Sequence, residues 1–263
     1  MTSSSSHPPQ EHQKMPDTFA DPAINKQAAR TQDPGTDSTE ILGAETQASE
    51  TQVCETQIAE SHTPGAPWND DLVHWYVDNY GEHPINALAV ELAVEFAGLN
   101  GSETLLDLGC GSGSAVRSAV STNRANRVIG IDPSPAMIRI AREKTAKQSQ
   151  DASPTSTSEF LLGGAEHIPL PDNSVDVVIA VNSFHHWPNP GKGLAEVARV
   201  LKHSGRLLLI EEIFEEQHRG MSAEEIIKQL DASAYNLKEF TRRPCVDIEV
   251  NVFFATPCGG NAL

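Results

Sequence analysis

The 263-residue chain is acidic, with 36 Asp and Glu against 19 Lys and Arg and a net charge of −17. It is long enough for one α/β domain with appendages, and the absence of a basic cluster disfavours nucleic acid as the main partner. No apolar run approaches the roughly 18 residues of a membrane span, and the four cysteines show no C-x-x-C, which predicts reduced thiols in a cytoplasmic protein.

Residues 1–67 are predicted to form a disordered, acidic, low-complexity tail. Ser, Thr, Gln, Pro and Glu dominate this segment, and residues 1–66 carry ten acidic and three basic side chains. Such a composition cannot bury enough apolar surface to offset the entropy lost on ordering. We therefore expect a single folded domain at residues 68–263. It is expected to open with helices at 71–79 and 84–98, since the second has apolar residues at helical spacing.

The most informative segment follows at 104–120, where an apolar run breaks into glycines at Gly109, Gly111 and Gly113. This pattern predicts a buried strand, a tight loop that lets a ligand approach the backbone, and then a helix. In α/β sheets, ligands bind at this carboxyl end of the strands. The lysine of a phosphate-binding P-loop is missing, and neither Gly109 nor Gly111 begins a complete G-x-G-x-x-G dinucleotide motif.

A second strand is predicted at 127–132 and ends in Asp132. A carboxylate in this position can accept hydrogen bonds from both hydroxyls of an adenosine ribose, so Asp132 indicates a nucleoside without identifying it. Ser134 and Pro135 predict the start of the next helix. Met137 then lies in the first turn of that helix, either over an adenine ring or in the core.

The remaining elements alternate as a parallel, doubly wound sheet requires. A polar insertion at 148–158 precedes strands at 160–162 and 177–182, which flank a loop rich in Gly, Pro and Asp. A helix at 193–202, a turn at 203–205 and a strand at 206–210 come next. Beyond them we expect a helix at 223–230 and a strand at 246–255, whose apolar residues alternate.

Three motifs in this order and spacing resemble those of the class I S-adenosylmethionine (SAM)-dependent methyltransferases. They are the G-x-G-x-G loop with Asp107 two residues upstream, Asp132 after the second strand, and the segment 163–176. Over 104–210 the chain is similar to the small-molecule family called type 11, which includes the ubiquinone and menaquinone methyltransferases. The resemblance implies a Rossmann-like α/β fold with a mostly parallel, seven-stranded sheet and an antiparallel C-terminal hairpin.

The resemblance also implies SAM as the cofactor and a small molecule as the methyl acceptor. The residues it assigns to cofactor binding are Asp107, Gly109, Cys110, Gly111, Gly113, Asp132, Pro133, Met137, Ala165, Glu166 and Asn182. Tyr76, Tyr80 and His83 resemble the cover that closes over SAM. One position departs from the family. Gly164 replaces the Asp that usually accepts the adenine amino group, so backbone near Ala165, the Glu166 side chain or water would have to replace it.

Methyl transfer from a sulfonium requires mainly alignment of donor and acceptor and exclusion of water. His185 and His186 are the candidate catalytic bases, because the pKa of histidine suits proton transfer near neutrality. The alternative is that they pack beside Trp187. They are adjacent and have no ligand partner at i+4, so no metal site is expected. Glu211 and Glu212 are expected to form a solvated pair at the edge of the acceptor pocket.

Two other hypotheses about the function stay open. A SAM- or nucleoside-binding protein without catalytic activity, acting through its acidic tail, is favoured only by Gly164. An NAD-dependent oxidoreductase is disfavoured by the missing third glycine. Carbon, oxygen and nitrogen acceptors are all compatible with the sequence, which identifies neither the acceptor nor the oligomeric state.

Overall fold

The computed structural model describes residues 68–79, 84–148, 156–213, 220–245 and 248–258. The expected disordered tail at 1–67, the cover residues Tyr80 and His83, and most of the 148–158 insertion lie outside these ranges. The elements in chain order are α2 (Asp70–Asn79), α3 (Pro84–Phe96), β1 (Thr104–Leu108), α4 (Ser114–Thr122), β2 (Arg127–Asp132), α5 (Pro135–Gln148), β3 (Thr157–Leu162), β4 (Val175–Val181), the short 3-10 helix η1 (Phe184–His186), α6 (Pro190–Val200), β5 (Leu201–Glu212), α7 (Ala223–Ala232), β6 (Tyr235–Cys245) and β7 (Ile248–Pro257).

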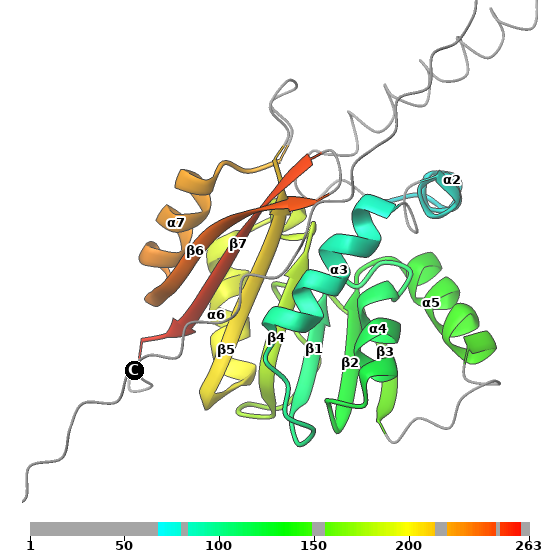
Figure 1. Ribbon diagram of the computed structural model, residues 1–263, viewed down its shortest axis with the longest axis horizontal. Helices are drawn as coiled ribbons and strands as arrows, with labels where there is room; N and C mark the ends of the chain where they lie inside the picture. Colours follow the sequence, from blue (N-terminus) through cyan, green and yellow to red (C-terminus); the bar gives the residue numbers. More distant parts are fainter. Residues whose placement is uncertain (1–67, 80–83, 149–155, 214–219, 246–247, 259–263) are drawn as a thin grey trace, which may run out of the picture. The chain divides into compact units, whose positions relative to one another are not determined.

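The strands form one seven-stranded sheet in the order β3-β2-β1-β4-β5-β7-β6 (Figure 1). The first five strands pair in parallel, whereas β7 runs antiparallel to both β5 and β6. The chain order reverses between β1 and β4, the point at which ligands of open α/β sheets bind. The predicted doubly wound sheet with its antiparallel C-terminal hairpin is therefore confirmed.

Helices cover both faces of the sheet, and successive strand residues point to opposite layers. Leu105, Ile179 and Leu208 pack in the layer that contains α3 and α4. Their neighbours Leu106 and Leu207 pack in the layer that contains α6 and α7. Because both faces are buried at the central strands β1, β2 and β4, these strands are mostly apolar, and this is why they could be recognised as short continuous runs.

One expectation about the C-terminal half was wrong, and one strand had no predicted range. The predicted turn at 203–205 lies within β5, where the pairing jumps from Val175 and Leu201 to Val177 and Arg206, so the extra residues are accommodated as an irregularity. The strand without a predicted range is β6, although the resemblance implied the hairpin that β6 forms with β7. This is an edge strand with mostly exposed side chains, and it lacks the apolar alternation used to recognise strands.

None of the helices in the described ranges is long and apolar enough to cross a membrane.

Candidate active site

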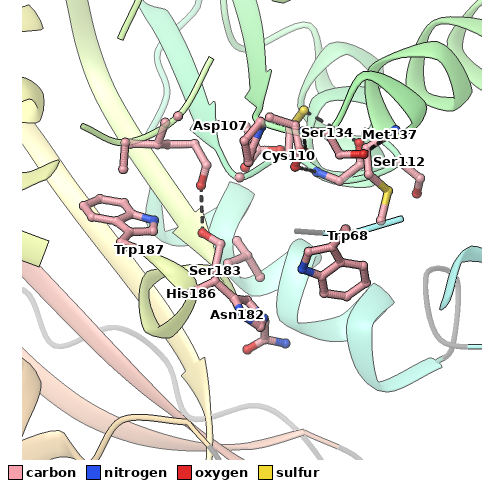
Figure 2. A pocket seen from close by; sticks show the side chains of 18 of the residues that line it. Trp68, Asp107, Cys110, Ser112, Ser134, Met137, Asn182, Ser183, His186 and Trp187 are labelled. Carbon is pink, nitrogen blue, oxygen red and sulfur yellow. Dashed lines mark hydrogen bonds between the residues drawn. The ribbon is translucent and has the colours of Figure 1, made fainter. Parts of the chain in front are cut away.

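A cavity of about 600 Å³ opens at the carboxyl ends of the parallel strands. It is bounded by the glycine loop after β1, the start of α5, the loop at 163–167, the segment after β4, and residues of α2 and α3. Figure 2 shows Trp68 and Trp187 on different sides of this cavity, with the Met137 side chain extending toward Trp68. A volume of this size suits a single small-molecule ligand, since such sites typically measure roughly 300–1,000 Å³.

The three glycines of the loop are needed for different reasons. All have positive φ, which non-glycine residues rarely adopt. A Cβ at Gly109 would lie 2.5 Å from the Ser183 Cβ, and one at Gly113 would lie 2.8 Å from Phe160, so both glycines allow close packing inside the protein. A Cβ at Gly111 would meet no described atom within 4 Å, and Gly111 lines the cavity. Gly111 is therefore the position where a ligand could approach the backbone.

Asp132 fixes the glycine loop to the start of α5. One carboxylate oxygen accepts the Gly111 N–H at 2.9 Å, and the other accepts the Ser134 N–H at 2.9 Å. Desolvation raises the pKa of this buried carboxyl, while the two backbone hydrogen bonds oppose that rise. Each oxygen has a second lone pair, so Asp132 can still accept hydrogen bonds from a ligand in the cavity.

Asp107 places a second buried carboxyl against the cavity. Its side chain is 2% exposed, and desolvation, reinforced by the nearby Asp132, raises its pKa to about 7. Two acidic groups in one water-poor site repel each other when both are ionised. A cationic group bound beside them would favour their ionised forms, so this end of the cavity suits a ligand with positive charge.

Aromatic side chains form the side of the cavity opposite the glycine loop. The Trp68 ring meets the rings of Tyr76 and His186 edge to face, with centroids 5.1 and 5.8 Å apart. Tyr76 also has its pKa raised to about 12 by desolvation and by the charge of Glu212. Met137 lines the cavity and also packs with Val73 of α2, so it is a core residue with one side toward the cavity.

The segment after β4 is held in place by its neighbours on both sides. The Ser183 hydroxyl donates to the Leu108 carbonyl at 2.7 Å, a bond that joins this segment to β1 (Figure 2). Asn182 has a φ of +49°, its side-chain oxygen accepts the Glu212 N–H, and its amide nitrogen donates to Asn86. Asn182 and Ser183 thereby present a fixed polar wall to the cavity.

Glu211 is buried, which contradicts the expectation of a solvated Glu211–Glu212 pair. Glu211 is 1% exposed, and one of its carboxylate oxygens accepts the N–H groups of Ser183 and Phe184 at 3.1 and 2.8 Å. The other oxygen is 2.5 Å from Nδ1 of His185. Glu212 is partly buried, and desolvation raises the pKa of its carboxyl. The carboxylate of Glu211 thus anchors the segment that leads to His186.

His185 and His186 occupy different surroundings although they are adjacent. Burial alone would lower the pKa of His185, but the charge and hydrogen bond of Glu211, together with Glu212, hold it above its ordinary value. The imidazole of His185 faces Glu211 and does not line the cavity. The His186 ring lies 4.0 Å from the His185 ring, centroid to centroid, and does line the cavity. His186 is therefore the histidine placed to reach a substrate.

The structure brings the expected site residues together with two exceptions. Those lining the cavity are Asp107, Gly109, Cys110, Gly111, Asp132, Pro133, Met137, Ala165, Glu166, Asn182 and His186. Gly113 and His185 do not line it: the first packs beneath the loop, and the second faces Glu211. Trp68 and Asn86 were missed, because a lone Trp before a helix and a lone Asn within one carry no motif. Among the described residues, no group of three or more His, Cys, Asp or Glu is placed to hold a metal ion.

Comparisons with known proteins show what the chain is similar to. Residues 106–209 match the family model described as a methyltransferase domain. An uncharacterized methyltransferase of Mycobacterium tuberculosis is 41% identical over 106 residues, which are 40% of this chain and 38% of that protein. The 27-O-demethylrifamycin SV methyltransferase of Amycolatopsis mediterranei is 31% identical over 161 residues, 60% of this chain and 57% of that enzyme. The chain thus spans less than two thirds of either relative.

A solved structure extends the likeness over more of the chain than the family model covers. The crystal structure of a SAM-dependent methyltransferase from Aquifex aeolicus superposes with a TM-score of 0.58 and 23% identity, covering 72% of this chain and 99% of that one. At this identity the likeness concerns the fold. Together with the match of residues 106–209 to the methyltransferase-domain model, it confirms the resemblance drawn from the motifs.

Proposed function

We propose that the chain is a SAM-dependent methyltransferase that acts on a small molecule. The observation that supports this most directly is the open space over Gly111, at the carboxyl end of β1 and beside the Asp132 carboxylate. A nucleoside cofactor fits this arrangement, since its ribose would meet Asp132 while its chain passes the glycine loop. In this proposal the methyltransferase domain covers 68–263.

Each part of the cavity then has a role toward the cofactor. Asp132 would accept the ribose hydroxyls, Met137 would cover the adenine face, and Ala165 and Glu166 would border the adenine edge. Asp107 would lie near the positively charged amino group. Gly109 and Cys110 would shape the loop around the methionine part, and Pro133 would flank the nucleoside. Gly113 would act from below, through its packing against Phe160.

When bound, SAM supplies a methyl group already activated by its sulfonium. The protein then has to orient the acceptor and exclude water, which the aromatic side of Trp68, Tyr76 and His186 is placed to do. Asn182 would hold the acceptor side of the cofactor. An imidazole nitrogen of His186 would take the proton of the acceptor. His185 would act indirectly, through the ring contact with His186.

The test is calorimetric titration with S-adenosylhomocysteine, using NAD as the control ligand. We expect micromolar or tighter binding of the first compound and none of NAD. Asp132→Ala should weaken binding by about 1–3 kcal/mol, the scale of lost charged hydrogen bonds. Its thermal midpoint should be recorded too, because Asp132 also holds the N–H groups of Gly111 and Ser134.

The outcomes separate the competing functions. Unchanged affinity in the folded Asp132 variant would contradict the ribose assignment. Tight binding by the wild type without methyl transfer to any of a broad panel of acceptors would favour the non-catalytic binding protein. NAD binding would favour the oxidoreductase.

Gly164→Asp is expected to raise the affinity for S-adenosylhomocysteine by about two- to tenfold, the value of one net hydrogen bond. A Cβ at Gly164 would come no closer than 4.0 Å to Pro133, so the larger side chain fits beside the cavity. Its carboxylate would then be free to accept the adenine amino group. Gly164→Ala adds the Cβ without the acceptor and should give no gain. The gain should vanish with S-inosylhomocysteine, which lacks the amino group; a gain retained there would refute the explanation.

A further inference from the structure

The loop at 163–172 borders the cavity but has little structure of its own. Its first five residues, 163–167, line the cavity. Within the loop, the backbone contacts are an isolated bridge between Gly164 and His167 and a hydrogen bond from the Leu170 N–H to the Ile168 carbonyl. A loop with so few internal bonds needs other contacts to keep one conformation.

The side chains of Ile168 and Leu170 supply apolar contacts, since both are buried in the core. Polar contacts come from two residues of α6, Glu196 and Arg199, which we call the α6 clasp. The guanidinium of Arg199 donates to the carbonyls of Ile168 and Leu170, both at 2.9 Å, and to the Asp172 carboxylate at 2.7 Å. Glu196 accepts the Ile168 N–H at 2.9 Å. Both backbone groups of Ile168 are therefore bonded to the same helix.

The α6 clasp is itself preorganised. Glu196 and Arg199 are one helical turn apart and form hydrogen bonds of 2.7 and 2.8 Å with each other. The hydrogen bond from Arg199 lowers the pKa of Glu196, and the two carboxylates of Glu196 and Asp172 raise the pKa of Arg199, so the clasp is charged at neutral pH. The fork of a guanidinium can serve several acceptors at once, which an ammonium group cannot do in the same geometry.

Helix α6 also contacts the cavity wall directly. A Cβ at Gly193 would lie 2.4 Å from Trp187 and 3.2 Å from Ala165, both of which line the cavity. Gly193 thus lets α6 lie close to Trp187 and Ala165 in the cavity wall. The clasp holds the loop farther along the chain, at Ile168 and Leu170. Neither Glu196 nor Arg199 lines the cavity.

We propose that Glu196 and Arg199 are positioning residues that hold the 163–172 loop in the conformation that binds the nucleoside. The proposal rests on the function proposed above. Without the clasp, the loop samples other conformations, and the apparent affinity falls with the fraction that remains competent to bind. The effect reaches the ligand through the loop, since no clasp side chain touches the cavity.

The test compares Arg199→Lys with Arg206→Lys as a matched control. Arg206 also donates from its guanidinium to backbone carbonyls of a loop, those of Ala97 and Gly98, but this loop follows α3 and lies outside the cavity lining. Both variants should lose similar thermal stability. In Arg199→Lys alone, the affinity for S-adenosylhomocysteine should fall about tenfold, as expected if one tenth of the loop population stays competent.

A second ligand and a second variant sharpen the result. 5′-Methylthioadenosine has the nucleoside but no amino-acid part, so it should lose affinity by the same factor. Glu196→Gln is the second variant, to be used if Arg199→Lys fails to fold. It removes the charge but keeps an oxygen for the Ile168 N–H, so its affinity for S-adenosylhomocysteine should fall by a smaller factor. Equal affinity of the folded variants and the wild type would overturn the proposal, as would an equal loss in Arg206→Lys. Failure of the wild type to bind would instead overturn the proposed function, and the clasp with it.

Discussion

Glu211→Ala is expected to lower the free energy of unfolding by about 3–5 kcal/mol, the usual result of removing one partner from a buried ion pair. The substitution would leave the N–H groups of Ser183 and Phe184 and the Nδ1 of His185 without their acceptor inside the core. Each such group loses its hydrogen bond without regaining water. Urea denaturation of the variant and the wild type measures the difference directly.

Two milder variants make the result interpretable. Glu211→Gln preserves the shape and an oxygen for the backbone N–H groups, so its loss should be clearly smaller. Glu159→Gln removes a carboxylate from an exposed pair with Arg127, and it should change stability by no more than about 0.5 kcal/mol. A loss in Glu211→Ala no larger than that of Glu159→Gln would show that the buried carboxylate is not an anchor.

The His185–Glu211 pair also predicts a pH dependence of stability. The pKa of His185 is raised in the folded state. At a pH between the unfolded and the folded pKa, His185 is therefore protonated in the folded protein and neutral in the unfolded chain. This contribution is fully present below the ordinary histidine pKa of about 6.5 and is lost as the pH rises through the folded value. Glu211→Gln removes the charge that raises this pKa. Its free energy of unfolding should therefore fall less steeply above pH 6.5 than that of the wild type.

The sequence predicted strands β1 to β4 because each contains a short apolar run that ends at, or is followed directly by, a Gly, an Asp or an Asn. The same signal placed Asp107, Asp132 and Asn182 at one edge of the sheet, where the structure brings them to one cavity. Strand β6 has no such signal, since exposed side chains dominate it and its position depends on pairing with β7.

The burial of Glu211 could not be predicted for a related reason. Two consecutive glutamates in a sequence normally indicate a solvated surface. The groups that bind the Glu211 carboxylate are the N–H groups of Ser183 and Phe184 and the imidazole of His185, which lie 26 to 28 residues earlier in the chain. Which acid is paired and which faces the solvent depends on where β4 and β5 end relative to each other, a long-range feature that local patterns do not encode. The same holds for the α6 clasp, whose partners in the 163–172 loop are 27 to 31 residues away.

Gly111→Val is expected to abolish cofactor binding while the protein still folds. The added side chain would meet no described atom of the protein within 4 Å of its Cβ, so its branches project into the space assigned to the ligand. Overlap with a ligand costs about 3 kcal/mol or more at the upper end of overpacking, which weakens S-adenosylhomocysteine binding at least about 100-fold. The φ of +49° adds backbone strain of about 1–2 kcal/mol, which lowers stability.

Gly101→Val is the control that distinguishes the effect of backbone strain from the effect of a side chain that overlaps the ligand. Gly101 has a φ of +101° and also has no described atom within 4 Å of a built Cβ, but it lies in the loop before β1, at the opposite end of that strand from the cavity. It should lose stability as Gly111→Val does and keep the wild-type affinity. Gly109 and Gly113 are unsuitable positions for this experiment. A side chain there would clash with Ser183 or Phe160, so the variant would report on folding and not on ligand binding. A folded Gly111→Val variant with wild-type affinity would mean that the ligand does not pass this loop, and the cofactor assignment would lose the observation that supports it.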